Sequence, residues 1–230
     1  MTGFRGQVTL DGPSGTGKSS VARGVAARLG AAYLDTGAMY RAATVAVLDA
    51  GVSLDDKIAV ARAVTEARIE VGTAARTEVV LVDGVDVAER IRGAEVTRAV
   101  SPVSAVPAVR RHLVAQQRSL VAEADAVVVE GRDIGTVVLP DATLKIYLTA
   151  DPEVRAQRRA GQLGITDPEK IAALARDLRR RDEYDSRRAD SPLRPAEDAV
   201  VVDSTGVDQQ GVIERIIELA ATAVGAGERA

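Results

Sequence analysis

The stretch GPSGTGKSS, residues 12–20, lies between the apolar run QVTLDG at 7–12 and a segment with helical periodicity over about 18–29. It fits the pattern G-x-x-x-x-G-K-[S/T] at every fixed position. Its glycines let the backbone turn tightly, so that successive N–H groups can point inward at phosphate oxygens. A strand, this loop and a helix, in that order, predict a phosphate-binding loop.

Each part of this loop has an expected role in holding a nucleoside triphosphate. Lys18 adds a positive charge that reaches the β- and γ-phosphates, and Ser19 places a hydroxyl on Mg²⁺. The positive end of the helix that follows points at the same phosphates. The predicted triphosphate-binding residues are Gly12, Pro13, Ser14, Gly15, Thr16, Gly17, Lys18, Ser19 and Ser20.

Outward from this loop, short apolar runs alternate with long helical patterns. The runs occupy 7–12, 31–35, 126–131, 144–149 and 199–204. Near-continuous apolar strands separated by helices predict a five-stranded parallel sheet covered on both faces, an α/β fold with three layers. Residues 67–72, 77–84 and 85–90 instead resemble short antiparallel strands joined by turns, which predicts a small β insertion.

Composition restricts the class of protein further. Apolar residues make up 46% of the 230 residues and aromatic residues 2%, so the core must be aliphatic. The formal net charge of −3 gives no reason to expect a nucleic-acid or anionic-membrane partner. The chain has no cysteine, which excludes disulfides and thiolate metal sites. It shows neither an N-terminal hydrophobic signal region nor an apolar run of about 18 residues, so we expect a cytoplasmic protein. It shows no oligomer signature, so we expect a monomer.

The predicted strands end in polar residues, which should meet at one edge of the sheet, where such folds bind ligands. These ends are Asp11-Gly12, Asp35-Thr36, Glu130-Gly131-Arg132-Asp133 and Asp203-Ser204. We expect Thr36 to be the N-cap of the next helix and Arg41 to lie one turn into it, making a second anion site. Ordinary capping with a surface arginine is the alternative interpretation.

The stretch RDLRRRDEYDSRRAD, residues 176–190, holds six arginines. A charge run of this kind often faces water. The preceding apolar positions, 171, 174 and 178, are spaced three and four residues apart, as on one face of a helix. The same spacing continued along the chain predicts that Arg181, Asp185 and Arg188 lie on this core-facing side. Buried guanidinium groups need partners. We interpret this face as a site for an anionic ligand, and an internal ion pair with Asp185 is the alternative.

The class of phosphate-loop protein follows from what accompanies the loop. The chain contains no asparagine and no T-K-x-D, so the guanine-recognition motif N-K-x-D is missing. The run VVVE at 127–130 could be a strand that ends in a catalytic glutamate of a motor protein, but the following Gly131-Arg132-Asp133 fits a substrate loop better. A small-molecule kinase is favoured, and a regulatory NTPase is the alternative.

Five motifs together resemble bacterial cytidylate kinase, in order and in spacing: GPSGTGKSS, LDTGAMYR, EGRDIGTVVLPDA, RRRDEYDSRRADSPL and VVDST. The resemblance covers essentially the whole chain. It implies phosphoryl transfer from ATP to CMP or dCMP with Mg²⁺. It also implies a core domain at 1–62, 103–150 and 166–230, an insertion at 63–102 that binds the nucleoside monophosphate, and a lid at 151–165. Kinases acting on UMP, AMP or a non-nucleotide acid remain alternatives.

The resemblance assigns roles to residues outside the phosphate loop. The predicted monophosphate ligands are Arg41, Arg132 and Arg188. The residues predicted to read the cytosine ring are Ser101, Arg110 and Asp133, with Ser104 as a second candidate hydroxyl. Arg181 and Asp185 are predicted to bind the sugar, and Asp35 and Thr36 to lie near the base or phosphate. The lid arginines predicted to reach the transferring group are Arg155, Arg158 and Arg159.

Overall fold

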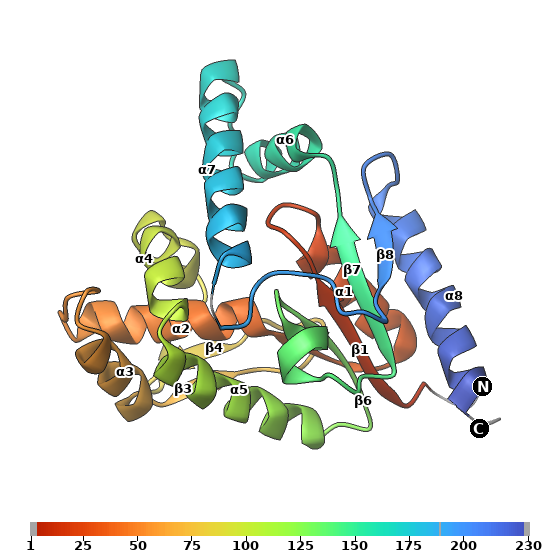
Figure 1. Cartoon of the computed structure of the whole chain (residues 1–230), viewed down its shortest axis with the longest axis horizontal. Helices are drawn as coiled ribbons and strands as arrows, with labels where there is room; N and C mark the ends of the chain where they lie inside the picture. Colours follow the sequence, from red (N-terminus) through yellow and green to blue (C-terminus); the bar gives the residue numbers. More distant parts are fainter. Residues whose placement is uncertain (1–3, 189, 228–230) are drawn as a thin grey trace.

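Five parallel strands form the central sheet, in the order β2–β6–β1–β7–β8 (Figure 1). They are β1 (Gly6–Asp11), β2 (Ala32–Asp35), β6 (Ala126–Glu130), β7 (Leu144–Thr149) and β8 (Val200–Asp203). This confirms the predicted sheet and its five segments. The computed structural model describes residues 4–188 and 190–227, so the outer ends of the predicted core domain, and residue 189 within the arginine-rich stretch, lie outside the described residues.

Helices cover both faces of the sheet because its central strands are apolar on both sides. Val8, Leu10 and Val128 point to the face covered by α1 (Lys18–Leu29) and α8 (Gln209–Gly227). Val127 and Val129 alternate with Val128 and pack on the opposite face. That face is covered by α5 (Pro107–Ala122) and by a π-helical turn, η2 (Ile134–Val138). The result is the predicted three-layer arrangement.

A second apolar core supports the predicted β insertion. Its sheet contains the antiparallel strands β3 (Ile69–Val71), β4 (Val80–Val82) and β5 (Val85–Asp86). These pack with α2 (Thr36–Asp49), α3 (Lys57–Glu66), the 3-10 turn η1 (Arg90–Arg92) and α4 (Ala94–Ser104). The predicted limits of the insertion, 63 and 102, fall inside α3 and α4, so these helices are shared with the core, and the domain division stays a prediction.

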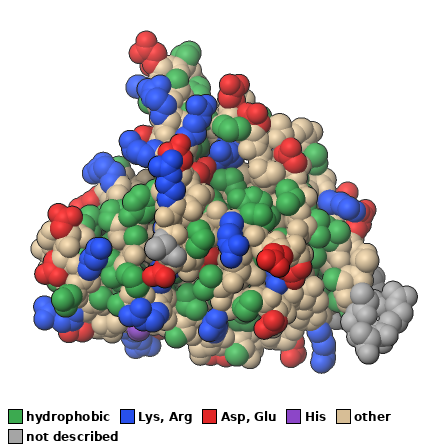
Figure 2. All heavy atoms as spheres, in the orientation of Figure 1, with side chains coloured by type: hydrophobic (Ala, Val, Ile, Leu, Met, Phe, Trp, Pro, Cys, Tyr) green, Lys and Arg blue, Asp and Glu red, His purple; other side chains and the backbone are tan. Residues whose placement is uncertain are grey.

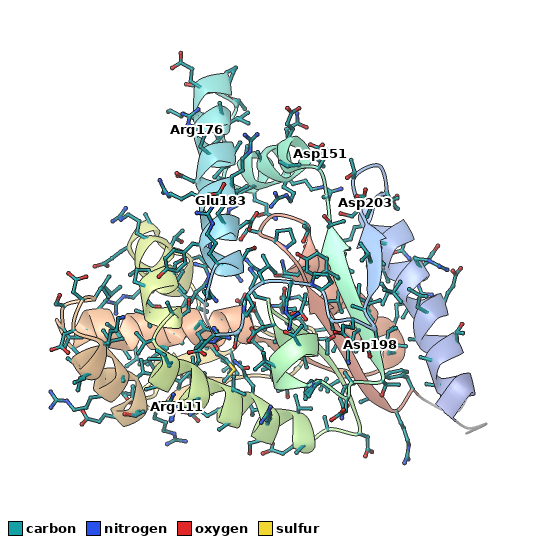
Figure 3. All side chains as sticks on the ribbon, in the orientation of Figure 1. Arg111, Asp151, Arg176, Glu183, Asp198 and Asp203 are labelled. Atoms are coloured by element: carbon teal, nitrogen blue, oxygen red, sulfur yellow. The ribbon has the colours of Figure 1, made fainter. Side chains whose placement is uncertain are left out.

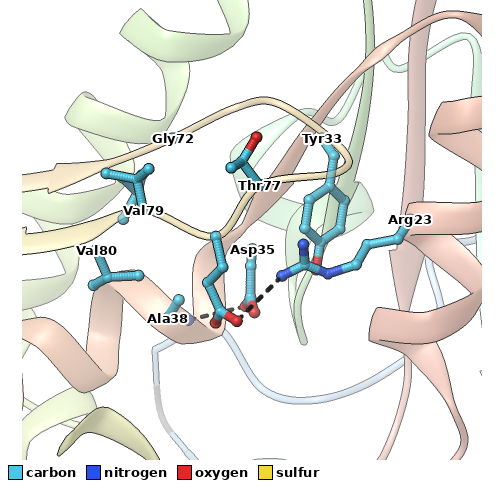
Figure 4. A pocket seen from close by; sticks show the side chains of 10 residues that line it. Arg23, Tyr33, Asp35, Ala38, Gly72, Thr77, Val79 and Val80 are labelled. Carbon is cyan, nitrogen blue, oxygen red and sulfur yellow. Dashed lines mark hydrogen bonds and ion pairs between the residues drawn. The ribbon is translucent and has the colours of Figure 1, made fainter. Parts of the chain in front are cut away.

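The loop between β3 and β4 joins the insertion to the central sheet. The backbone N–H of Tyr33 in β2 donates to the Thr73 carbonyl at 2.8 Å. The Arg23 guanidinium lies 4.6 Å from the centre of the Tyr33 ring and 3.9 Å from Glu78, at a small pocket between the two parts (Figure 4). Glu78 also accepts a 2.5 Å hydrogen bond from Arg92. The insertion is therefore attached to the edge strand whose end carries Asp35.

Two helices stand above the carboxyl ends of the strands, α6 (Pro152–Gln162) and α7 (Pro168–Ser186) (Figure 1). Each begins with an Asp-Pro pair, in which the aspartate caps the helix and the proline occupies its first turn. The predicted lid corresponds to α6 and the turn after it, and its role stays a prediction. Among the helices formed by residues 4–188 and 190–227, none is long and apolar enough to cross a membrane.

Candidate active site

The phosphate loop connects β1 to α1 at the centre of the sheet's carboxyl edge. Gly12 has φ of 144° beside the Leu148 carbonyl of β7, a conformation and a closeness that exclude a side chain. Gly17 has φ of 90° and forms the N-cap of α1. The predicted helix start at Lys18 is confirmed, and the first N–H groups of α1 open toward the loop.

Lys18 is folded back onto the loop and is buried. Its Nζ donates to the Pro13 carbonyl at 2.7 Å, and the Thr16 hydroxyl donates to the same oxygen at 3.2 Å. Burial lowers the pKa of Lys18, and the nearby charge of Arg132 lowers it further. An anion bound in the loop would reverse that effect, because it would favour the charged amine.

Ser19 and Glu130 form an oxygen-rich pair at the edge of this loop. The Ser19 hydroxyl donates to Glu130 Oε2 at 3.0 Å, and the Tyr33 hydroxyl donates to Glu130 Oε1. Burial raises the pKa of Glu130, and the charge of Asp35 adds to this. A hydroxyl and a carboxylate fit Mg²⁺, which prefers oxygen ligands and usually takes one or two from the protein. Ser19 is the residue predicted to bind Mg²⁺, and Glu130 is the glutamate at the end of the VVVE strand.

A buried carboxylate, Asp185, organises the arginines of the acceptor side. It is 1% exposed and accepts from Arg132 Nε at 3.2 Å and from Arg188. Arg132 also donates to the Ser14 hydroxyl of the phosphate loop at 2.6 Å. The structure therefore brings three predicted substrate residues together and links them directly to the phosphate loop.

Two further arginines add positive charge that Asp185 does not neutralise. Burial, together with the charges of Arg132 and Arg41, lowers the pKa of Arg181 to about 9. Burial likewise lowers the pKa of Arg41 to about 10. Arg41 donates to the Ile91 carbonyl at 3.1 Å and to the Thr97 hydroxyl at 3.2 Å. The arrangement suits a ligand with more than one negative charge.

The predicted orientation of α7 is confirmed by its burial pattern. Asp185 is its one buried residue, and Arg181 is half-buried on the same side. Arg176 and Arg179 are exposed, and Figure 2 shows basic side chains along this outer surface. Arg176 and Glu183 lie on that surface in Figure 3. The structure shows the internal ion pair of Asp185, and the site for an anionic ligand stays a prediction.

Arg110 and Asp133 form a second buried pair beside this cluster, as predicted for residues of one site. Arg110 donates to Asp133 Oδ2 at 2.5 Å and to the Ser104 carbonyl at 3.2 Å. Asp11 fixes the loop that carries Asp133, because its carboxylate accepts the N–H groups of residues 134 and 135 at 2.9 and 2.8 Å. Burial raises the pKa of Asp11 to about 6.

Of the two candidate serines, Ser104 makes the contacts with this group. Its hydroxyl accepts from Arg188 at 3.2 Å and donates to the Ser101 carbonyl at 3.0 Å. Helix α4 runs through Pro102 to Ser104, which places the two serines almost one turn apart. Ser101 is half-buried, and its predicted contact with the base stays a prediction.

The expected N-cap at Thr36 is wrong. Asp35 has extended backbone geometry, with φ of −89° and ψ of 95°, and its carboxylate accepts the Ala38 N–H at 2.9 Å. Asp35 is therefore the N-cap, and Thr36 is the first helical residue. The Thr36 hydroxyl donates instead to the Glu130 carbonyl at 2.7 Å, which joins the ends of β2 and β6.

The three arginines of α6 reach different places. Arg155 is buried against the phosphate loop, where it donates to the Ser14 carbonyl at 3.0 Å and to Asp182 at 2.5 Å. Arg158 extends to the end of β8 and donates to the Ser204 carbonyl at 2.7 Å. Asp151 and Asp203 mark the ends of β7 and β8 at this side of the sheet (Figure 3).

Arg159 is half-buried and donates to the Gln162 side chain of its own helix at 3.0 Å. Burial lowers the pKa of Arg159, and the charge of Arg92 lowers it further, while Arg159 itself lowers the pKa of Arg41. The role in transfer predicted for all three arginines of α6 stays a prediction.

Asp182 is a site residue that sequence reasoning missed. It accepts the Ser14 N–H at 3.1 Å as well as the Arg155 guanidinium. The sequence could have indicated this role, because Asp182 lies beside Arg181 and about one turn before Asp185 on α7.

Comparison with known proteins identifies close relatives. The family model described as cytidylate kinase matches residues 8–222. A cytidylate kinase of Rhodococcus opacus is 57% identical over 96% of this chain and 97% of its own length. One from Corynebacterium glutamicum is 52% identical over 92% and 93%. A gluconokinase structure from Sinorhizobium meliloti covers 99% of both chains with a TM-score of 0.54 at 16% identity, a likeness of fold alone.

Proposed function

This chain belongs to the cytidylate kinase family, and we propose that its arginine cluster around Asp185 receives the phosphate of the acceptor nucleotide. The enzyme transfers a phosphoryl group from ATP to CMP or dCMP, giving ADP and CDP or dCDP. The assignment of the acceptor site, and of each residue in it, is the part proposed here.

One observation carries the assignment: the buried carboxylate of Asp185 accepts from only two of the four arginines that gather next to the phosphate loop. The four arginines are Arg41, Arg132, Arg181 and Arg188. Burying this much unneutralised charge is costly without an anion to receive it. The hydrogen bond from Arg132 to the Ser14 hydroxyl supports the proposal, because Ser14 belongs to the phosphate loop. A monophosphate there would lie next to the terminal phosphate of ATP.

The geometry fits a reaction that needs positioning and charge stabilisation. The acceptor atom is already an anionic phosphate oxygen, so the reaction needs no strong general base. Arg41, Arg132 and Arg188 would orient that oxygen with charge-assisted hydrogen bonds. Lys18 would exchange its contact with the Pro13 carbonyl for the transferring group, where its charge offsets the charge that develops.

The remaining residues divide between base, sugar and donor. Arg110 and Asp133 present a donor and an acceptor to the cytosine edge, while Arg181 and Asp185 would contact the sugar hydroxyls. Ser101, Asp35 and Thr36 would complete the acceptor side. The phosphate loop holds ATP, and movement of α6 would bring Arg155, Arg158 and Arg159 toward the transferring group and exclude water.

Mg²⁺ would be held by Ser19 and Glu130 together with the phosphates of ATP. The ion would supply positive charge to the β- and γ-phosphates. The Tyr33 hydroxyl orients Glu130 toward Ser19. We further propose a cytoplasmic monomer without a nucleic-acid or membrane partner, in keeping with the net charge of −3.

The experiment that tests the proposal measures ADP release from Mg-ATP with CMP, dCMP, UMP, AMP, gluconate or no acceptor. We expect a large rise with CMP and dCMP only. A rise confined to another acceptor would overturn the assignment of Arg110 and Asp133. The same slow release in every reaction would favour the regulatory NTPase.

A further inference from the structure

A fully buried carboxamide, Gln117, lies outside every role assigned above. It is 0% exposed. Among residues 4–188 and 190–227, neither its Oε1 nor its Nε2 has a hydrogen-bond partner. Leu113 and Val121 lie one turn to either side on the same face of α5, and both are apolar core residues. A leucine or methionine would continue that face without burying an amide.

The buried amide is costly to the folded protein. A buried polar group without a partner destabilises a protein by about 1–3 kcal/mol. Packing of the core alone therefore does not account for Gln117. A residue whose chemistry opposes stability at a given position is a candidate for a role in binding or catalysis.

The neighbour of Gln117 is the hydroxyl of Tyr40. Burial is the main reason that the pKa of Tyr40 is raised to about 12, and the adjacent Gln117 side chain opposes that rise. Within the described part of the chain, the Tyr40 hydroxyl also has no hydrogen-bond partner. A small rotation of either side chain would join the two, because a carboxamide can both donate to and accept from a hydroxyl.

Tyr40 in turn supports the predicted base-reading pair. The Arg110 guanidinium lies 5.1 Å from the centre of the Tyr40 ring, within the range of a cation–π contact. Arg110 and Gln117 are two turns apart on one face of α5, so Tyr40 spans the distance between them. Arg110 Nε is itself buried and, among the described residues, unpartnered. The orientation of Arg110 thus depends on the surface beneath it as well as on Asp133.

We propose that Gln117 is a positioning residue for base recognition, which holds the Tyr40 ring so that Arg110 and Asp133 keep the orientation that accepts cytosine. This inference rests on the acceptor site proposed above. Gln117 does not touch the nucleotide. It restricts the tilt of the ring on which the guanidinium lies, and a small tilt would misdirect both groups that contact the base.

The test compares Gln117→Met with Gln116→Met. Methionine nearly matches glutamine in volume and removes only the amide. Gln116 is the matched control, since it is adjacent on α5 and bonds to His112 instead. For each variant, kcat/KM is measured with CMP and with UMP, together with KM for ATP and the free energy of unfolding.

We expect Gln117→Met to lower the ratio of kcat/KM for CMP over UMP by about tenfold, mainly through KM for CMP. KM for ATP should stay within about twofold, and unfolding should be no easier than in the wild type. Gln116→Met should leave the ratio unchanged. An unchanged ratio in a folded Gln117→Met would overturn the inference, since a purely structural role changes stability and not selectivity.

Tyr40→Phe serves as the second variant if Gln117→Met does not fold. It removes the hydroxyl that Gln117 faces and should give the same loss of selectivity. An unchanged ratio in this variant would likewise overturn the inference. A wild type that ignores CMP would overturn the proposed function itself, and the two failures are therefore distinguishable.

Discussion

Replacing Arg188 with methionine tests the acceptor site in isolation from the donor site. Methionine keeps much of the apolar stem and removes the guanidinium, which donates to Asp185 and to the Ser104 hydroxyl. The side chain is 9% exposed, so a phosphate bound to it would be largely shielded from water. None of its hydrogen bonds goes to the described residues of the phosphate loop.

The expected loss follows from the bonds removed. A hydrogen bond to a charged partner contributes about 1.5–3 kcal/mol, so kcat/KM for CMP should fall roughly 10- to 150-fold. Asp185 keeps its bond to Arg132, so the free energy of unfolding should fall by only about 1–3 kcal/mol. The ATP dissociation constant should change by less than about threefold, because Arg188 contributes to the acceptor side.

The assay combines initial rates over a range of CMP concentrations with direct titration of ATP. Arg179→Met is the control, because Arg179 lies exposed on the opposite side of α7. Its kcat/KM should stay within about twofold of the wild type. Equal losses of CMP use and ATP affinity in Arg188→Met, or an equal effect in both variants, would refute the reasoning.

Three other substitutions test the groups that hold the site together. Asp185→Asn should lower the free energy of unfolding in urea by about 3–5 kcal/mol, because it leaves buried arginines unpaired. The exposed Asp177→Asn should change it by less than about 1 kcal/mol, and equal effects would contradict the ion-pair account. Gly12→Ala should lower the free energy of unfolding by more than about 2 kcal/mol, because Gly12 has φ of 144° beside a main-chain oxygen. Gly206→Ala is its control, because no atom lies within 4 Å of the position that its Cβ would take. Burial raises the pKa of Asp11 from 3.8 to about 6, so the stability that it contributes is fully present below pH 3.8 and is lost as pH rises through 6. The deficit of Asp11→Asn relative to the wild type should therefore shrink by roughly 2–3 kcal/mol between pH 4 and pH 7. A constant difference would show that Asp11 titrates normally.

The features predicted correctly are those whose determinants are contiguous or periodic. The phosphate loop is one contiguous segment, and its pattern gave the glycine turns and the start of α1 at Lys18 correctly. The apolar spacing that ends in Arg181, Asp185 and Arg188 likewise gave the correct buried side of α7, because a helix repeats every 3.6 residues. Such features depend on local backbone geometry, which is determined by residues close together in the sequence.

Contacts between distant segments were harder to predict. Ser14 and Asp182 are 168 positions apart, and their hydrogen bond depends on how α7 sits above the loop. The choice between Ser101 and Ser104 depended on whether α4 continued through Pro102. Thr36 and Asp35 are both good N-caps, and the end of β2 decided between them. The burial of Gln117 depends on how α5 packs in the folded protein, so the sequence alone does not predict it.

The most direct test of the central claim is a crystal structure of the enzyme with CMP and a non-hydrolysable ATP analogue. The account predicts the CMP phosphate among Arg41, Arg132 and Arg188, facing Lys18 across the transfer path, with cytosine against Arg110 and Asp133. A CMP phosphate bound elsewhere, such as at the exposed arginines of α7, with this cluster still closed on Asp185, would contradict it.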